Sequence, residues 1–220
     1  MIQAGGRLAP EIVKEYADYA HQTGKRFFVM YGQTEAAPRI SYLPFEKTQE
    51  KPSSIGIAIP GGELSLEDAD GKVILSEETE GELVYKGENV CMGYAQSREE
   101  LSQGDTNHGI LHTGDLAKKD KDGYYFITGR KKRFVKIWGN RVSLDSIESI
   151  VKQVTLNCAC VGKDDKLVVF INDPDKKNGV EELLATTTGF NRSAFEIRVI
   201  PTIPKNDTGK TQYSHLQSLI

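Results

Sequence analysis

The sequence lacks the features that mark exported, membrane-spanning and nucleic-acid-binding proteins. No stretch approaches the roughly 20 consecutive apolar residues of a membrane span, and residues 1–6 have neither the charged nor the apolar region of a signal peptide. The 28 Lys and Arg residues are scattered and are outnumbered by 31 Asp and Glu residues, so no concentrated basic surface is expected. We therefore expect a soluble, cytoplasmic protein with no membrane span and no nucleic-acid partner.

Cysteine is also scarce. The three cysteines, Cys91, Cys158 and Cys160, are odd in number and lie beside no second cysteine pair or histidine cluster. This pattern argues against a disulfide framework and against a zinc site. We expect these residues to be small buried side chains in a reducing compartment.

The beginning of the chain predicts one helix followed by one strand. Pro10 opens a pattern of helical spacing that predicts a helix over 11–22, and residues 26–31 form a continuous apolar run. Such a run without alternation is typical of a strand covered on both faces in a parallel sheet. The loop 32–35 would then follow the carboxyl end of that strand, where open α/β sheets bind ligands.

Residues 54–128 predict a β-rich lobe of short strands separated by turns. The strands are expected over 55–59, 62–66, 81–85 and 124–128, with turn signals at Asp70-Gly71 and Asp122-Gly123. Because only one helix and strand pair precedes this lobe, the core of the first domain looks unfinished. A partner chain or an upstream segment is expected to complete it.

A charged cluster over 130–133 precedes a second run of structure. Strands are expected over 134–138, 167–171 and 197–200, with helices over 144–154 and near Glu181. The predicted fold class is α/β plus α+β. Residues 1–131 would be the end of a large domain, with one βα unit and the β-rich lobe, and residues 132–220 a small α+β domain.

Four segments carry residues suited to the chemistry of activating a carboxylate with ATP. That reaction needs an adenine slot, a ribose clamp, a metal ligand, and cations that offset the repulsion between two anions. The segments are Tyr31-Gly32-Gln33-Thr34-Glu35, His112-Thr113-Gly114-Asp115, the stretch 129–141, and Pro204-Lys205-Asn206-Asp207-Thr208-Gly209-Lys210. A strand-ending tyrosine could stack on a purine, and Asp115 after a Thr-Gly turn could accept hydrogen bonds from two hydroxyls.

In order and spacing, the four segments resemble the adenylate-forming superfamily of acyl-CoA synthetases, peptide-synthetase adenylation domains and luciferases. Gly81-Glu82-Leu83 and Gly93-Tyr94 lie between them as in that family. The resemblance covers nearly the whole chain and places it in the carboxy-terminal half of such an enzyme.

The resemblance implies roles for the residues of the first domain. Tyr31, with Gly32 and Gln33 in the same turn, would contact the adenine of ATP or AMP. Thr34 would meet the phosphate, and Glu35 would hold Mg²⁺. Asp115 would bind both ribose hydroxyls with the assistance of Arg130.

The resemblance also assigns residues of the second domain. Lys132 falls on the hinge between the two domains. Lys136, Gly139 and Arg141 match positions that approach the phosphate or line the thiol tunnel. Lys210 matches the catalytic lysine that bridges the substrate carboxylate and the ATP phosphate.

The implied function is ATP-dependent activation of a small carboxylic acid to an acyl-adenylate, with release of pyrophosphate. The acyl group would then pass to the thiol of coenzyme A or of phosphopantetheine on an acyl carrier protein. Among the departures from the family, the Ser/Thr/Gly-rich phosphate loop is absent, and Thr211-Gln212-Tyr213 replace the basic residue expected after Lys210. This chain is therefore expected to be an inactive fragment that needs the upstream half of the ligase.

Two other interpretations are open. The chain could be a non-catalytic AMP-binding or interaction module derived from such a ligase. It could also belong to an adenylating enzyme whose acceptor is an amine or a hydroxyl.

Overall fold

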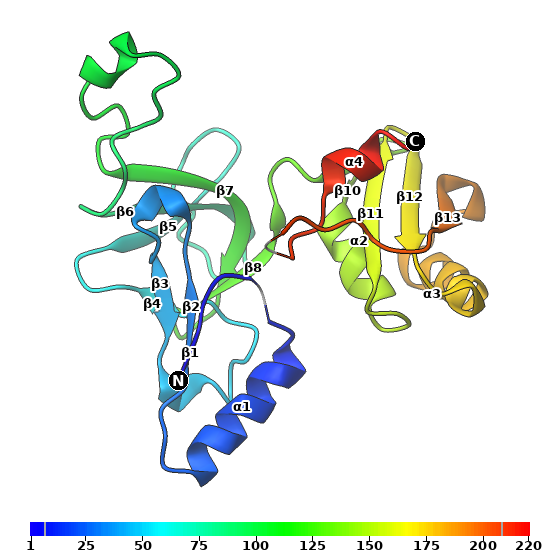
Figure 1. Cartoon of the computed structure of the whole chain (residues 1–220), viewed down its shortest axis with the longest axis horizontal. Coiled ribbons are helices and arrows are strands. Elements are labelled where there is room, and N and C mark those ends of the chain that lie inside the picture. Colours follow the sequence, from blue (N-terminus) through cyan, green and yellow to red (C-terminus); the bar gives the residue numbers. More distant parts are fainter. Residues whose placement is uncertain (7, 208) are drawn as a thin grey trace. The chain divides into compact units, whose positions relative to one another are not determined.

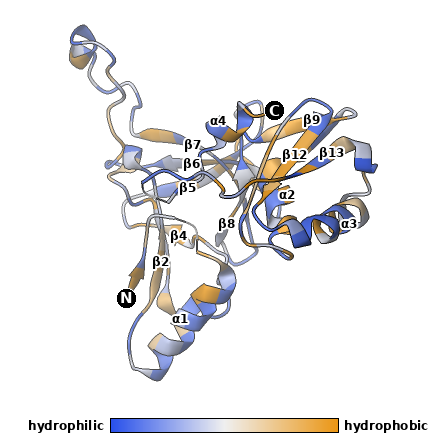
Figure 2. Ribbon diagram, turned by 45° about the vertical axis from the view of Figure 1, so that its right-hand side comes forward, coloured by the Kyte–Doolittle hydropathy of each residue, from blue (hydrophilic) through white to orange (hydrophobic). Residues whose placement is uncertain are grey.

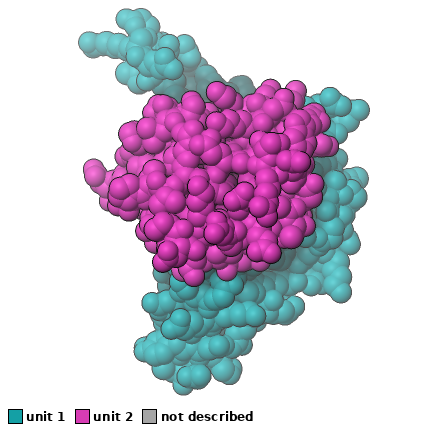
Figure 3. Space-filling view, turned by 90° about the vertical axis from the view of Figure 1, so that its right-hand side faces the viewer, with its two compact units in different colours: residues 1–128 teal, residues 129–220 magenta. Residues whose placement is uncertain are grey.

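Residues 1–6, 8–207 and 209–220 are described by a computed structural model in which the chain divides into two units (Figures 1 and 3). Unit 1 comprises Met1–Thr128 and unit 2 comprises Gly129–Ile220. The chain passes from one unit to the other within strand β8 (Tyr125–Arg130), shortly before the boundary predicted at 131–132. Arg7 and Thr208 lie outside the described residues.

The first sheet of unit 1 has four strands in the order β1-β2-β3-β4. Their bounds are β1 (Ile2–Gln3), β2 (Phe28–Tyr31), β3 (Ser41–Leu43) and β4 (Ile57–Ala58). Strand β2 pairs parallel with β1 and antiparallel with β3, so the sheet is mixed and the expected parallel sheet is wrong. The connection 32–40 is too short for the crossover that a parallel neighbour requires.

Helix α1 (Pro10–Gln22) lies between β1 and β2 in the chain and confirms the predicted helix. Its buried side chains, Val13, Ala17 and Ala20, recur at the spacing of one helical face. They pack against Val29 and Leu43 of the first sheet and against Phe27, which directly precedes β2. This contact covers one face of the sheet and fixes β2, the strand that leads into the predicted nucleotide turn.

The second sheet of unit 1 has the order β5-β6-β7-β8, and its first three strands pair antiparallel. Its remaining strands are β5 (Glu63–Glu67), β6 (Gly81–Lys86) and β7 (Ile110–Lys119). Strand β7 was not predicted, because its sequence Ile-Leu-His-Thr-Gly-Asp-Leu-Ala-Lys-Lys contains a turn-like segment in its middle. Tyr31 from the first sheet packs against the apolar clusters around Tyr85 and around Leu83.

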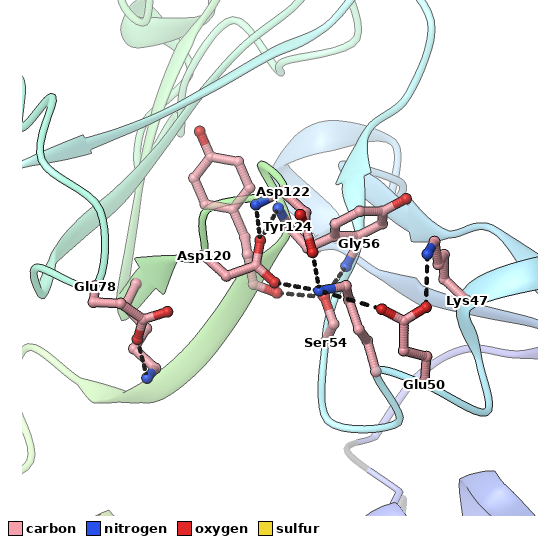
Figure 4. A network of polar contacts seen from close by, with 11 residues as sticks. Lys47, Glu50, Ser54, Gly56, Glu78, Asp120, Asp122 and Tyr124 are labelled. Atoms are coloured by element: carbon pink, nitrogen blue, oxygen red, sulfur yellow. Dashed lines mark hydrogen bonds and ion pairs between the residues drawn. The ribbon is translucent and has the colours of Figure 1, made fainter.

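Lys51, between β3 and β4, pairs with Asp120 and Asp122 in the turn between β7 and β8, and Figure 4 labels both aspartates. Its ammonium group lies 2.7 Å from the Asp120 carboxylate and 2.8 Å from that of Asp122, and 5.1 Å from the centre of the Tyr124 ring. These hydrogen bonds raise the pKa of Lys51, so the ammonium group stays charged. The Asp122-Gly123 turn predicted from the sequence is thus held from outside the hairpin as well as by its own backbone.

Unit 2 is built on a three-stranded sheet and a hairpin. The sheet has the order β11-β12-β13, with β12 antiparallel to β11 and parallel to β13. The strands are β9 (Phe134–Ile137) and β10 (Asn140–Ser143) in the hairpin, and β11 (Cys158–Lys163), β12 (Lys166–Ile171) and β13 (Phe195–Val199) in the sheet. The central strand β12 is almost wholly buried and is coloured hydrophobic in Figure 2.

The helices of unit 2 are amphipathic and cover both faces of this sheet. Helices α2 (Leu144–Val151) and α3 (Lys177–Thr188) pack on one face, and Leu216 of α4 (Tyr213–Gln217) packs on the other. Ser143 caps α2 by accepting a hydrogen bond from the Ser146 amide at 3.2 Å. Among the helices of the described residues, none combines the length and apolar character needed to span a lipid bilayer.

Replacing Gly56 by alanine should destabilise unit 1 more than the same change at Gly61. Both glycines have φ +83°, which costs an L-residue about 1–2 kcal/mol. Only at Gly56 would the added Cβ lie 1.8 Å from the Tyr42 carbonyl oxygen, which should cost about 1–3 kcal/mol more. Urea-induced unfolding of the two variants would measure the difference, and equal losses would contradict the close packing of β3 on Gly56.

Candidate functional site

Three residues predicted to bind a nucleotide meet at the end of β2. The hydroxyl of Tyr31 donates a hydrogen bond of 2.6 Å to the Asp115 carboxylate, across 84 positions of sequence. The side-chain amide of Gln33 donates to the Thr113 carbonyl at 2.8 Å and to the same carboxylate at 3.3 Å. Burial and the Asp115 carboxylate raise the pKa of Tyr31, so the phenol remains a donor. The turn after β2 therefore holds a buried carboxylate in a fixed orientation.

Asp115 reaches Tyr31 through a bulge in β7. Glu82 pairs with Leu116 and Val84 pairs with His112, so the three residues 113–115 stand opposite Leu83 alone. The Thr113 hydroxyl closes the bulge by donating to the Leu83 carbonyl at 2.7 Å. The expectation of a Thr-Gly turn before Asp115 is thus wrong. Gly114, at φ +70°, lets the strand insert residues and then resume its pairing.

Gly32 is required where it stands, because the chain folds back on it. A Cβ atom at this position would lie 1.8 Å from the Pro38 carbonyl oxygen. The chain then forms the short 3₁₀ helix η1 (Thr34–Ala36), which leaves Thr34 exposed and Glu35 half-buried. Because the chain turns tightly at Gly32, Thr34 and Glu35 lie next to the turn that carries Gln33.

Glu35 is the one predicted metal ligand, and it has a partner from a distant segment. Its carboxylate accepts a hydrogen bond of 2.5 Å from the Tyr94 hydroxyl. This bond and the Glu35 backbone amide hold the pKa of Glu35 below its usual value, so the carboxylate is ionised at neutral pH. In the described part of the chain, no group of three or more His, Cys, Asp and Glu side chains could hold a metal ion. A single ionised carboxylate still suits Mg²⁺, which commonly uses one or two carboxylates together with substrate phosphates.

The predicted residues at the start of unit 2 lie in a turn and a hairpin. The Arg130 amide donates to the Asp145 carboxylate at 3.0 Å, and Lys132 is exposed in the turn before β9. Lys136 and Arg141 stand directly opposite each other on β9 and β10, with both side chains exposed. Gly139 at φ +82° closes the hairpin between them. The structure thus brings two of the predicted cations together on one face of a hairpin.

Lys210 is hydrogen-bonded to Asn206 through its backbone. Its amide donates to the Asn206 side-chain oxygen at 2.8 Å, and its carbonyl accepts from the Asn206 amide at 2.9 Å. Lys205 and Thr211 pair antiparallel at the base of the turn. The Lys210 side chain is exposed. Thr208 of the same motif lies outside the described residues.

Sequence reasoning gave no role to Tyr94 or to Thr113. Both belong to segments that the sequence singled out, Gly93-Tyr94 and His112-Thr113-Gly114-Asp115. Their partners, Glu35 and the Leu83 carbonyl, are distant in sequence, so only the register of β6 and β7 reveals the contact at Thr113. The signal that could have found Tyr94 is an aromatic residue directly after a glycine in a polar segment.

Comparison with known proteins finds relatives of this chain. The model of the AMP-binding enzyme family matches residues 1–95. The long-chain-fatty-acid–CoA ligase of Escherichia coli O6:H1 is 30% identical over 219 residues, which cover 94% of this chain and 38% of that ligase.

Solved structures show the same fold. The o-succinylbenzoate CoA synthetase of Bacillus subtilis, in complex with its acyl-adenylate intermediate, matches with a TM-score of 0.76 and 21% identity over 98% of this chain and 45% of its own. That synthetase is also known with ATP and a magnesium ion. The amide bond synthetase of Marinactinospora thermotolerans matches with a TM-score of 0.74 and 19% identity over 99% of this chain and 46% of its own.

These comparisons support placing the chain in the adenylate-forming superfamily. The structural matches show that it has the mixed α/β fold of adenylate-forming enzymes. The chain spans less than half the length of the relatives that it matches.

Replacing Tyr94 by phenylalanine should raise the pKa of Glu35 towards its usual value, because the variant loses the hydroxyl that stabilises the ionised carboxylate. Since the pKa of Glu35 is lowered by folding, this bond stabilises the protein above the unfolded pKa and is lost as pH falls through the folded pKa. Carboxyl ¹³C NMR titration would measure the change. Glu196, whose pKa is lowered by Arg198 and Lys166 in unit 2, should titrate unchanged, and an unchanged Glu35 would refute the contact.

Proposed function

We propose that this chain is the carboxy-terminal part of an acid–thiol ligase that activates a carboxylic acid with ATP. In the first step a carboxylate oxygen of the acid attacks the α-phosphorus of ATP, which forms the acyl-adenylate and releases pyrophosphate. In the second step a thiolate attacks the acyl carbon, which forms the thioester and releases AMP. The relatives named as CoA ligases and the structure with an acyl-adenylate support this reaction.

The observation that carries the proposal is the cluster of Tyr31, Gln33 and Asp115. A buried carboxylate with its orientation fixed by two donors is suited to accept hydrogen bonds from the vicinal hydroxyls of a ribose. The Tyr31 ring stands at the end of a strand, where it can contact a purine face. A protein that only needed a stable fold would gain little from a buried carboxylate at this place.

Thr34 and Glu35 are suited to the phosphate end of the nucleotide. The Thr34 hydroxyl is exposed and can donate to a phosphate oxygen, while Glu35 can hold Mg²⁺ through its ionised carboxylate. Mg²⁺, when bound, would supply positive charge against the phosphate oxygens. The structure of a similar synthetase with ATP and a magnesium ion supports this assignment.

The cations of unit 2 are assigned by resemblance and by their exposure. Lys210 would stabilise the charge that develops between the acid and the phosphate in the first step. Arg130 would assist at the ribose, and Lys132 would act as the hinge. Lys136, Gly139 and Arg141 would serve the phosphate or the thiol acceptor, since two exposed cations on one face favour an anionic ligand.

The acceptor that we propose is the thiol of coenzyme A, with carrier-protein phosphopantetheine as the related form. The name of the E. coli relative supports coenzyme A. Because an amide bond synthetase has the same fold, the assay must also be able to detect transfer to an amine. The proposal further includes a cytoplasmic location and an upstream half of the ligase, which would supply the phosphate loop and the acyl pocket.

Replacing Asp115 by asparagine should weaken AMP binding about tenfold or more, because a hydrogen bond to a charged acceptor is worth about 1.5–3 kcal/mol. Calorimetric titration of this chain with AMP would measure the affinity. Asp122→Asn is the matched control, since that carboxylate pairs with Lys51 in a turn of the same unit. Equal affinities for the two variants, or no AMP binding by the parent chain, would count against the ribose role.

Acid-dependent exchange of labelled pyrophosphate into ATP should be strongly slowed by Lys210→Ala and retained by Lys205→Ala. Both lysines are exposed in the same turn, but only Lys210 is assigned to the developing charge, so its loss should slow exchange about 100-fold or more. The assay uses the longest protein whose reading frame contains this chain, with fatty and aromatic acids. Thiol transfer from a preformed acyl-adenylate should be largely spared.

The outcomes of this assay separate the interpretations. Exchange that is strongly slowed in Lys210→Ala and persists in Lys205→Ala supports the ligase. Absence of exchange in the parent protein, despite measurable AMP binding, supports a non-catalytic AMP-binding module. Exchange followed by transfer to an amine but not to coenzyme A would replace the proposed acceptor.

A further inference from the structure

A buried network in unit 2 joins three segments of the chain at one carboxylate. Glu148 on α2 is 5% exposed and accepts hydrogen bonds from the Arg133 guanidinium at 2.7 Å, the Cys160 amide at 2.8 Å and the Tyr213 hydroxyl at 3.0 Å. Arg133 also pairs with Asp145 and donates to the Cys160 carbonyl. A buried carboxylate is costly unless it is paired and hydrogen-bonded, and Glu148 meets both conditions.

Arg133 and Tyr213 form the centre of this network. The Arg133 guanidinium carbon lies 3.7 Å from the centre of the Tyr213 ring, within the range of a cation–π contact. Burial and the Glu148 carboxylate raise the pKa of Tyr213, so its phenol stays protonated and keeps donating. Tyr213 is thus held on its ring face by one partner and at its hydroxyl by another.

The position of Tyr213 connects the network to the Lys210 turn. The Gln212 amide donates to the Pro204 carbonyl at 2.9 Å and closes the base of the turn, and Tyr213 is the next residue. Helix α4, which begins at Tyr213, has only five residues and is too short to be stable by its own hydrogen bonds. Contacts of its side chains therefore decide where the base of the turn lies within unit 2.

We propose that Tyr213, Arg133 and Glu148 are positioning residues that fix the base of the Lys210 turn against α2 and the segment after Lys132. They act through the backbone that carries Lys210 and do not touch the reacting atoms. The catalytic part of this inference rests on the proposed function of Lys210, whereas the structural part does not.

Replacing Tyr213 by phenylalanine tests the proposal, because phenylalanine keeps the ring over Arg133 and removes only the bond to Glu148. Hydrogen–deuterium exchange of this chain should become about tenfold faster in peptides that contain the amides of Lys210 and Gln212, with peptides of β12 unchanged. Tyr16→Phe on the exposed side of α1 is the matched control and should leave all these peptides unchanged. Unchanged exchange at the turn in Tyr213→Phe would overturn the structural part.

The catalytic part is tested in the longer protein used for pyrophosphate exchange. Tyr213→Phe should lower kcat for exchange about tenfold, leave KM for the acid unchanged, and spare thiol transfer from a preformed acyl-adenylate. If the rates of pyrophosphate exchange and of thiol transfer fall by the same factor, the variant has lost folded protein in general, and the positioning role is overturned. If the parent protein lacks exchange altogether, the proposed function fails, while faster deuterium uptake at the turn still supports the structural role of the network.

Discussion

The geometry around Tyr31 depends on the bulge in β7. The residues 113–115 stand opposite Leu83 alone, so β7 resumes its pairing with β6 two positions further along the chain and Asp115 lies within the bulge. The Thr113 hydroxyl, bound to the Leu83 carbonyl, and Gly114, with its positive φ, keep this insertion in place. The hydrogen bond between Tyr31 and Asp115 follows from that register. A feature of the backbone thus determines where a charged side chain lies.

Unit 2 also fixes a charged side chain, here through two side-chain donors and one backbone donor. Glu148 is a buried carboxylate whose three donors come from a residue beside the predicted hinge, from β11 and from α4. The sequence departs from its family after Lys210, where a basic residue is expected and Thr211-Gln212-Tyr213 stand. The structure puts the Arg133 guanidinium over the Tyr213 ring, so a positive charge is present at this place but comes from another segment.

The local sequence pattern predicted the helices and strands whose apolar residues recur periodically. It did not predict strands that form only because they pair with distant strands. Helix α1 and the strands near 62–66, 81–85 and 167–171 were predicted because apolar spacing or β-branched runs mark them. Strands β7 and β11 were missed, since β7 contains Thr-Gly-Asp and β11 is a short run of small residues. The nucleotide residues were named from motifs, but the contacts of Tyr31 with Asp115 and of Glu35 with Tyr94 join distant positions that no local pattern connects.

The facing pair of Lys136 and Arg141 has a consequence for how the β9–β10 hairpin responds to its surroundings. Two like charges directly across a strand pair repel each other. The Phe134 ring, 3.8 Å from the Arg141 guanidinium carbon, and the Asp164 carboxylate, which accepts a hydrogen bond from the Lys136 amide, offer partial relief. That repulsion weakens as dissolved ions accumulate, so the hairpin should be tighter in concentrated salt than in dilute buffer. A polyvalent anion bound to both side chains would offset the repulsion between Lys136 and Arg141. Like charges placed opposite each other would therefore favour the anionic ligand proposed for this hairpin.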